Sequence, residues 1–481
     1  MRLRLHTTEL YLRNSVLRIP FRYGNTCLTR CPQAILQAVV ETDAGRCVGY
    51  SGDCLPSGWF DKSTPDYQQQ LDDMFEVIAL AQRVAMESFA APQELFRGWL
   101  PLYERVAEVA RERGFTSLLA TFGVSLVERA LMDAMCRAVG LSFAEAVRKN
   151  IFCIEPTAIH DSLTWQPKDW LPKLPTSEID VRHTVGLGDP LTAAEIPATD
   201  QLQDGYPQAL EQYVERFGIR FLKIKVSNQL DTDLERLRTI AALVEKACGS
   251  DYRVTLDGNE QYQTPAEFDQ LVDAIEGDAR LRQLWRNTLV IEQPLNRAIA
   301  LSPKHTEGIR QLGQKKPVII DESDGELDAY TRALALGYRG VSCKNCKGPI
   351  KTLLNAGLTW LANDFGKQSH FVMTGEDLCS VGIVPMQADL CLAATIGLTH
   401  VERNGYHFHP GLAYLPEQQQ RAALKEHADC YALIDGLVRP QVVDGKLAIE
   451  SLQCPGFGFS VLPDVEEMVA ANDWRYESLG L

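Results

Sequence analysis

The sequence predicts an α/β protein in which an N-terminal α+β domain is followed by a (β/α) barrel. The first region combines a hairpin-like pattern with two helical stretches, whereas from about residue 183 short apolar runs alternate with helical patterns. In addition, five consecutive apolar runs end in a charged residue. At 481 residues the chain exceeds the roughly 250–300 at which one hydrophobic core stops growing, so two domains are expected.

Residues 1–150 are predicted to form the α+β domain. Residues 32–50 read as a hairpin, because two strand-like segments flank the turn signal DAG. Helical patterns follow at residues 70–89 and 121–140. The apolar residues of the second pattern recur on one helical face: Val124, Val127, Leu131 and Met135.

The rest of the chain divides into three predicted parts. Residues 151–182 contain several prolines and no clear period, which is typical of a connecting insertion. The barrel is expected over residues 183–430, and residues 431–481 are expected to return to the N-terminal domain.

The strand-like runs of the barrel region alternate with helical segments, which implies a parallel sheet and, in so long a series, a barrel. These runs are HTVGL, FLKIKV, YRVTLD, LVIEQP, PVIIDES, RGVSCKN and HFVMTG. In FLKIKV, strand alternation places Lys223 and Lys225 on the same face. A solvated edge strand would explain both lysines, but the strands of a closed barrel are interior. We therefore expect both amines to face the lumen or its rim.

The ionisable residues at the strand ends are the candidate catalytic groups. They are Lys225, Asp257, Glu292, Asp321 and Lys344. The carboxyl ends of barrel strands form the catalytic face of such folds, so these side chains are predicted to converge there. A structural ion-pair network is the alternative reading of the same pattern.

Three neighbouring carboxylates, Asp257, Glu292 and Asp321, would raise one another's pKa if they converged without compensation. A divalent cation resolves this conflict, and oxygen ligands without His or Cys indicate Mg²⁺, with Mn²⁺ as a substitute. Asp321 and Glu322 are adjacent, so only one of them is expected to point inward, and the sequence leaves open which.

The two terminal lysines of this set, Lys225 and Lys344, are expected on opposite sides of the metal. One amine could remove the proton α to a substrate carboxylate and the other could return it, while the cation stabilises the enediolate. Metal and ammonium charges are expected to depress the pKa of these lysines.

Composition excludes several classes of partner. With 48 basic and 63 acidic residues the net charge is -15, which disfavours nucleic acid and anionic membranes. The N-terminus has no signal-peptide pattern and no run approaches the ~20 apolar residues of a membrane span. A cytoplasmic protein with a small-molecule carboxylate as partner is expected, and a homo-oligomer is left open.

The cysteines and histidines do not complete a metal site. The 13 cysteines show no framework spacing, which suits a reducing compartment. Cys343 and Cys346 form a lone CxxC and are expected to be structural. His407 and His409 lack a third ligand and are expected to be loop or packing residues.

With these motifs in view, the chain resembles the enolase superfamily, in its mandelate racemase/muconate lactonizing enzyme branch. The matching motifs, in the order of the family, are KIK at 223–225, LDGN at 256–259, IEQP at 291–294, DES at 321–323 and CKN around Lys344. A Lys or His base that acts with Mg²⁺ to form an enediolate is the established chemistry of this superfamily. The resemblance implies a (β/α)7β TIM-like barrel with an N-terminal α+β capping domain.

The resemblance also implies roles for single residues. Asp257, Glu292 and Asp321 would be metal ligands, Lys225 and Lys344 the acid/base pair, and Lys223 a helper that polarises the substrate carboxylate. A loop of the capping domain would close over the substrate. The candidate substrate contacts are Asn259, Glu376, Tyr23 and Arg22, with Asn25 in the same loop as the last two. Glu376 and Asp377 either contact substrate or cap a helix.

The function expected from these features is a racemase, epimerase or cycloisomerase. An acid-sugar dehydratase or other lyase is the alternative, but His370 lies at the start of its strand, at the wrong end of the barrel. HVERNG at 400–405 lacks the paired-aspartate signature of dipeptide epimerases. A class I aldolase would use a barrel lysine as a Schiff base and need no metal. A carboxylate-binding protein without catalysis is the non-enzymatic alternative.

Overall fold

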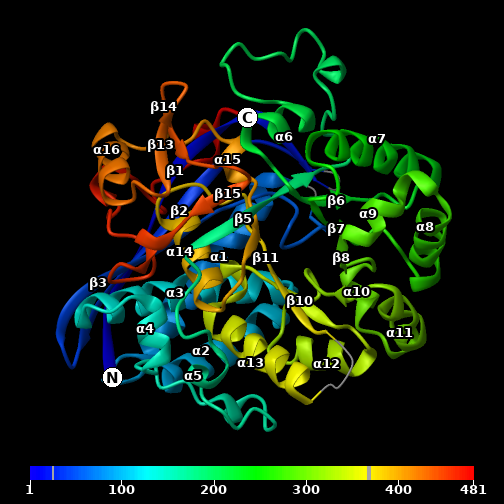
Figure 1. The fold of residues 1–481 in the computed structure, drawn as a ribbon. Helices are drawn as coiled ribbons and strands as arrows, with labels where there is room; N and C mark the ends of the chain where they lie inside the picture. The colour runs from blue at the N-terminus through cyan, green and yellow to red at the C-terminus, as the bar shows by residue number, and fades with distance from the viewer. Residues whose placement is uncertain (24–25, 65, 366–369) are drawn as a thin grey trace.

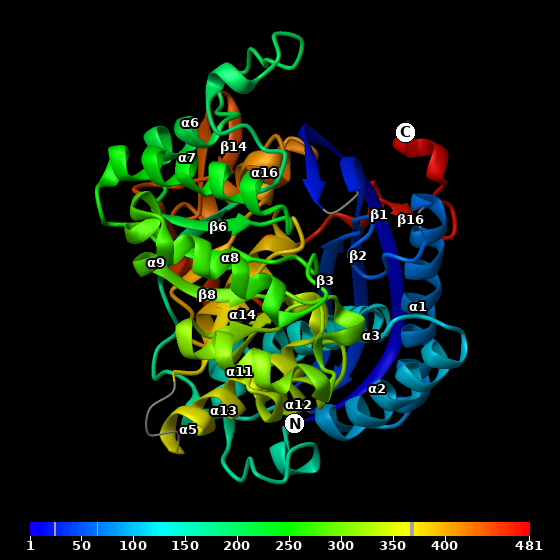
Figure 2. The same cartoon turned by 90° about the vertical axis from the view of Figure 1, so that its right-hand side faces the viewer.

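The structure is a computed structural model that describes residues 1–23, 26–64, 66–365 and 370–481. An antiparallel sheet with helices on one side forms the N-terminal part, and a nearly closed parallel barrel forms the rest (Figures 1 and 2). The predicted α/β fold class, a (β/α)7β TIM-like barrel with an N-terminal α+β capping domain, is confirmed.

The capping sheet has the order β16-β1-β2-β3, and the short strand β4 also pairs with β1. Its strands are β1 (Arg2–Tyr23), β2 (Thr26–Thr42), β3 (Gly45–Cys54), β4 (Gln93–Glu94) and β16 (Val469–Ala470). The predicted hairpin is the β2–β3 pair, whereas the long strand β1 escaped prediction. The pairing of β1 with β2 is irregular between Val16 and Phe21, just before the end of β1.

Three long helices cover the capping sheet, namely α1 (Tyr67–Ser88), α2 (Leu95–Glu112) and α3 (Ser117–Val139). Thr116 begins α3 by accepting a hydrogen bond from the Leu119 N–H (3.3 Å), and Gly140 ends it in a left-handed conformation (φ 66°). Both faces of α3 are buried. Its Arg129 forms a buried ion pair with Asp53 of β3, so the charged face of this helix packs on the sheet instead of facing solvent.

The barrel sheet runs β10-β11-β12-β5-β6-β7-β8-β9, and a parallel bridge between Ile320 and Val341 joins its two ends. Its strands are β5 (Glu178–Val185), β6 (Phe221–Lys225), β7 (Arg253–Asp257), β8 (Thr288–Glu292), β9 (Val318–Ile319), β10 (Gly340–Cys343), β11 (Val372–Gly375) and β12 (His400–Glu402). The barrel therefore begins at Glu178, before the first predicted strand, and β12 is a short strand that the apolar runs did not reveal.

Helices surround the barrel strands (Figure 1). The larger ones are α6 (Leu210–Phe217), α7 (Leu230–Cys248), α8 (Pro265–Gly277), α9 (Arg282–Asn287), α11 (Thr306–Lys315), α12 (Ala329–Leu336), α13 (Pro349–Phe365) and α14 (Val384–Thr395). Smaller elements complete the described chain: α4 (Phe143–Arg148), α5 (Pro167–Trp170), α10 (Arg297–Ala300), α15 (Gly405–Phe408), α16 (Glu417–Glu426), β13 (Tyr431–Ile434), β14 (Leu437–Pro440) and β15 (Lys446–Ala448). Within the described ranges, no helix is both long and apolar enough to cross a bilayer.

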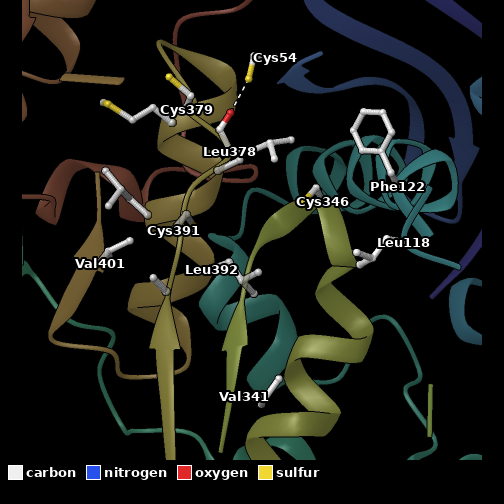
Figure 3. Close-up of a cluster of buried hydrophobic side chains, with 14 of the residues drawn as sticks. Cys54, Leu118, Phe122, Val341, Cys346, Leu378, Cys379, Cys391, Leu392 and Val401 are labelled. Carbon is white, nitrogen blue, oxygen red and sulfur yellow. Dashed lines mark hydrogen bonds between the residues drawn. The ribbon is translucent and has the colours of Figure 1, made fainter. Parts of the chain in front are cut away.

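The hydrophobic core is continuous between the capping domain and the barrel. In Figure 3, Leu118 and Phe122 of α3 lie beside Cys346, which follows β10. The Cys54 thiol at the end of β3 donates a hydrogen bond to the Leu378 carbonyl, which follows β11. The two parts of the chain are thus packed together through side chains at the carboxyl ends of the barrel strands.

A buried carboxylate also joins the two parts. Glu128 of α3 accepts hydrogen bonds from the Trp99 indole (2.9 Å) and from the Ile350 N–H at the start of α13 (2.6 Å). A negative charge is favourable at a helix N-terminus. Burial nevertheless raises the pKa of Glu128 to about 7, and these hydrogen bonds offset the effect only in part.

The pKa of Glu128 predicts a pH dependence of stability. Because the folded pKa exceeds the unfolded value, ionisation favours the unfolded chain as pH rises from about 4.5 to 7. In urea unfolding, the wild-type protein should lose about 2 kcal/mol of unfolding free energy between pH 5 and pH 7. Glu128→Gln should not show this loss, because glutamine does not ionise. Exposed Glu108→Gln is the control and should keep the wild-type pH slope; a wild-type slope in the Glu128 variant would refute the assignment.

Candidate active site

A cavity of about 340 Å³ lies at the carboxyl ends of the barrel strands, under the capping domain. The barrel contributes Lys223, Lys225, Asp257, Asn259, Gln261, Asp321, Glu322, Lys344, Asp377, Leu378, Cys379, Glu402 and Asn404. The capping domain contributes Phe21, Tyr23, Thr26, Pro56, Ser57, Gly58, Trp59, Lys62, Thr64 and Gln70. The strand-end residues that the sequence singled out therefore converge at one place, except that Glu292 is wholly buried and does not line the cavity.

Lys223 occupies the centre of a buried carboxylate cluster. Its amine donates hydrogen bonds to Glu292 (2.7 Å), Glu376 (2.7 Å) and Glu402 (3.2 Å). It also lies 3.3 Å from a carboxylate oxygen of Asp257. Burial lowers the pKa of Lys223, but the four carboxylates outweigh burial and raise it well above its ordinary value. Lys223 is therefore an ammonium ion whose hydrogen bonds are taken by protein carboxylates.

A second buried cation supports the same cluster from β5. Arg182 forms an ion pair with Glu376 and donates to the Gly375 carbonyl (2.7 Å). Burial raises the pKa of Glu376 well above its ordinary value, whereas Lys223 overcomes burial and holds the pKa of Glu402 well below. Glu376 thus lies beneath the cavity as part of this network, which is neither of the two roles expected for it.

Lys344 and Lys347 hold Asp321 from the other side of the barrel. The Asp321 carboxylate accepts hydrogen bonds from Lys344 (2.7 Å), Lys347 (2.7 Å) and the Ser342 hydroxyl (2.5 Å). Burial lowers the pKa of Lys344, but the charges of Asp321 and Glu376 reverse the effect and raise it above its ordinary value. A depressed lysine pKa is expected for Lys225 and Lys344 under the charge of a bound metal; with protein groups alone, the carboxylates around Lys344 act in the opposite direction.

Lys225 has a different environment from Lys223 and Lys344. Its amine donates to the Asn259 side-chain oxygen (3.2 Å), and no carboxylate among the described residues lies within ion-pair distance. Asn259 has a left-handed backbone (φ 44°), and its N–H donates to Asp257 (2.7 Å). The turn after β7 thus places one amide side chain between the amine of Lys225 and the neighbouring carboxylates.

Asp321 and Glu322 both line the cavity, although alternation along a strand predicted that only one would point inward. The reason is that β9 ends at Ile319, so the alternation does not extend to these residues. Glu322 is buried, and burial together with the charge of Asp321 raises its pKa to about 7. One of its oxygens has no hydrogen-bond partner.

The carboxylates of the site fit Mg²⁺ by their chemistry and charge. Glu292 Oε2 and Glu322 Oε2 are buried without a partner, which is costly for a carboxylate oxygen. Oxygen-only donors of this kind suit a hard dication. As the side chains stand, no group of three His, Cys, Asp or Glu residues within the described part of the chain is arranged to hold a metal, because lysines bind the carboxylates.

The capping domain closes the cavity with a segment held by ion pairs. The Trp59 ring centroid lies 4.8 Å from the Lys344 amine. Arg297 donates to the Trp59 carbonyl (3.0 Å) and pairs with Glu260 (2.8 Å), which also binds Lys62. These contacts fix the cover over the carboxyl ends of the barrel strands and were not foreseen, since they join residues distant in sequence.

The remaining sequence candidates divide between the cavity and other places. Tyr23 lines the cavity and donates to the Ser57 carbonyl (2.5 Å). Arg22 is exposed and lines a different cavity, since neighbouring residues of β1 point to opposite sides. Asn25 lies outside the described residues. Asp377 caps the turn after β11 by accepting from the Cys379 N–H (3.1 Å).

The histidines and cysteines behave as expected. His370 is exposed before β11, at the opposite end of the strand from the cavity. His407 and His409 are buried, as are Cys343 and Cys346. The described residues that line the cavity include no histidine.

Sequence reasoning missed Glu402, Asn404, Lys347 and Arg182. Glu402 ends β12 and so obeys the same strand-end rule, but the three-residue strand gave no apolar run to mark it. Lys347 follows Lys344 by one turn of a 3-10 helix, a spacing that could have flagged it.

Of the comparisons with known proteins, only that with solved structures found matches. No protein-family model matches the chain, and a search of curated proteins found no match. A solved mandelate racemase/muconate lactonizing protein from Herpetosiphon aurantiacus is similar with TM-score 0.61 and 16% identity over 96% of this chain and 99% of that one.

Two further solved structures contain magnesium. A dipeptide epimerase from Enterococcus faecalis, complexed with Mg and the dipeptide L-Leu-L-Tyr, has TM-score 0.58 and 14% identity over 95% of this chain and 99% of that one. An enolase from Bradyrhizobium, complexed with magnesium and mandelic acid, has TM-score 0.57 and 14% identity over 98% of this chain and 99% of that one. The chain thus has the fold of the enolase superfamily along nearly its whole length.

The Lys223 cluster predicts a large effect on stability. Lys223→Met should destabilise the protein by about 3–5 kcal/mol in urea unfolding, because it leaves buried carboxylates without their cation. Lys62→Met is the matched control and should cost about 1 kcal/mol or less, since Lys62 is partly exposed and Glu260 keeps Arg297. Equal unfolding midpoints for the Lys223 variant and wild type would contradict the central role of Lys223.

Proposed function

We propose that this protein is an enolase-superfamily enzyme that abstracts the proton α to a substrate carboxylate, acting as a racemase, epimerase or cycloisomerase. The observation that carries the proposal is the pair of amines, Lys225 on β6 and Lys344 after β10, that line one cavity from different sides of the barrel. The solved dipeptide epimerase and the solved enolase described above hold a dipeptide and mandelic acid, both of which are carboxylates.

In this proposal Lys225 and Lys344 exchange protons with the α-carbon. Each amine could serve as base for one stereoisomer and as acid for the other, which is what racemisation requires. Lys344 is oriented by Asp321 and Trp59, and Lys225 by Asn259. The covering segment with Trp59 excludes water from the reacting carbon.

Lys223 has a different role in this scheme from the one that the resemblance implied. Its hydrogen bonds to protein carboxylates argue that it positions Glu292 and Glu402, instead of polarising the substrate directly. Asn404 supports this arrangement by donating to Glu402 (3.0 Å).

Asp257, Glu292 and Asp321, with Glu322 as a further candidate, would hold Mg²⁺. When bound, the ion would neutralise the negative charge that develops on the substrate carboxylate. An acid-sugar dehydratase that relies on a histidine base is less well supported, since the described lining includes no histidine.

Isotope exchange tests the two lysines. In D₂O, Lys344→Ala should abolish α-proton exchange from one stereoisomer of a substrate, and Lys225→Ala from the other, by about 10²–10⁴-fold. The screen would start from mandelate, N-acyl amino acids, dipeptides and acid sugars, with proton NMR as readout. Lys315→Ala, which removes a lysine paired with Asp269 and Asp273, is the control and should exchange like wild type. Unchanged exchange of both stereoisomers in either active-site variant would refute the proposal.

Metal dependence is tested by binding as well as activity. EDTA should abolish exchange and Mg²⁺ should restore it. In calorimetry, Asp257→Asn should weaken Mg²⁺ binding by about tenfold or more, because it removes a charged oxygen ligand. Asp251→Asn, two residues before the start of the same strand and exposed, should bind like wild type. Equal Mg²⁺ affinity in both variants would exclude Asp257 as a ligand.

A further inference from the structure

A second cavity of about 640 Å³ lies beside the barrel, outside the candidate active site. It is bounded by the end of β1, by α15 and by the segment 186–209 that joins β5 to α6. Among the residues that the structure describes, none lines both cavities. This cavity is therefore a separate compartment, although it approaches β1 from the side opposite to the catalytic residues.

The segment 186–209 is long for a connection in a barrel. Apart from the short turn Ala193–Glu195, it contains no helix or strand, and it projects from the body above α6 (Figures 1 and 2). Connections longer than about 12–15 residues without secondary structure are uncommon and usually functional. It follows the carboxyl end of a barrel strand, where binding sites of such folds are built.

Two arginines that line this cavity each have one buried N–H without a hydrogen-bond partner. Arg18, whose side chain is 4% exposed, binds Asp204 (3.1 Å) and the Tyr206 carbonyl (2.6 Å), but its Nη1 is buried without a partner. Arg236 donates to the Gly186 carbonyl (2.5 Å), and its Nε is also buried without a partner. A guanidinium stays charged at any physiological pH, so these donors call for an acceptor.

Two further residues of the lining are Tyr213, whose hydroxyl interacts with Arg18, and His407, whose buried Nδ1 has no hydrogen-bond partner. Buried polar atoms are nearly always paired, so unpaired atoms on several residues of one lining favour a bound group at this cavity.

The carboxylates that line this cavity accept hydrogen bonds from other residues of the segment 186–209. Asp189 accepts from the Gly186 N–H (2.7 Å), and Glu195 accepts from the Leu191 N–H (2.9 Å). Asp200 accepts from the Thr199 hydroxyl (3.0 Å). These carboxylates organise the backbone of the segment, whereas the guanidinium groups of Arg18, Arg236 and the exposed Arg22 line the cavity.

Much of the remaining lining is apolar, including Val185, Leu187, Ile196, Leu210 and Phe408. A ligand that fits must therefore combine an apolar body with an oxygen-rich anionic group. We propose that this cavity binds a small organic anion, a carboxylate or a phosphate ester, with the anionic group held by Arg18 and Arg236.

Calorimetry with phenyl phosphate and with benzoate tests the proposal and separates the two anion types, while benzyl alcohol serves as the neutral control. Wild type should bind at least one of the anions and not the alcohol. Arg236→Gln should weaken binding about tenfold or more, because it removes a charge-assisted hydrogen bond. Arg238→Gln is the matched control: it lies on the same helix but binds Asp278 and should leave the affinity unchanged.

A second variant guards against loss of folding in the first. Gly188 lines the cavity, and a Cβ added there would meet only Arg22 Cδ within 4 Å, at 3.7 Å. Gly188→Phe should therefore fold and block the cavity, abolishing anion binding. Lys344→Ala should retain it, which separates this cavity from the catalytic one.

The proposal is overturned if wild type takes up neither anion at millimolar concentration. It is also overturned if Gly188→Phe binds like wild type, or if binding is lost in Lys344→Ala alone. The last result would place the anion in the catalytic cavity.

Discussion

Charge compensation inside the barrel holds the candidate site together. Carboxylates at the ends of neighbouring strands cannot share a water-poor space unless cations lie among them. The positive charge comes from Lys223 and Arg182 beneath the cavity and from Lys344 and Lys347 on another side of the barrel. The same ion pairs fix the positions of the groups that chemistry would use, so stability and preorganisation have one origin.

Much of the fold and part of the site could be predicted from the sequence. The apolar runs ending in Lys225, Asp257 and Glu292 revealed the parallel strands, because barrel strands are continuous and buried on both sides. The pairing of these charges could not be predicted, since strand alternation gives the face of Lys223 but not which carboxylates reach it. The prediction that only one of Asp321 and Glu322 would point inward failed for a related reason, because the short strand β9 ends before both residues.

The cover of the cavity shows the same limit. The segment that covers the cavity is held in place by contacts of Trp59, Lys62 and Arg297 with residues far apart in the chain. Neither sequence periodicity nor composition marks these residues. Glu128 is similar, since a glutamate in an apolar helix gives no sign that it accepts a hydrogen bond from the Ile350 N–H, at the start of a helix in the other part of the molecule. Long-range partners of buried polar groups require coordinates.

The end of β1 forms a wall shared by two compartments. Phe21 and Tyr23 face the candidate active-site cavity and Arg22 faces the other, just after the irregular pairing of β1 with β2. Since side chains repeat every second residue, insertion or deletion of one residue at that irregularity would exchange the two sets. An arginine would then enter the candidate active-site cavity and two aromatic rings would leave it, so the gain or loss of a single codon at this position would change the chemistry of both linings.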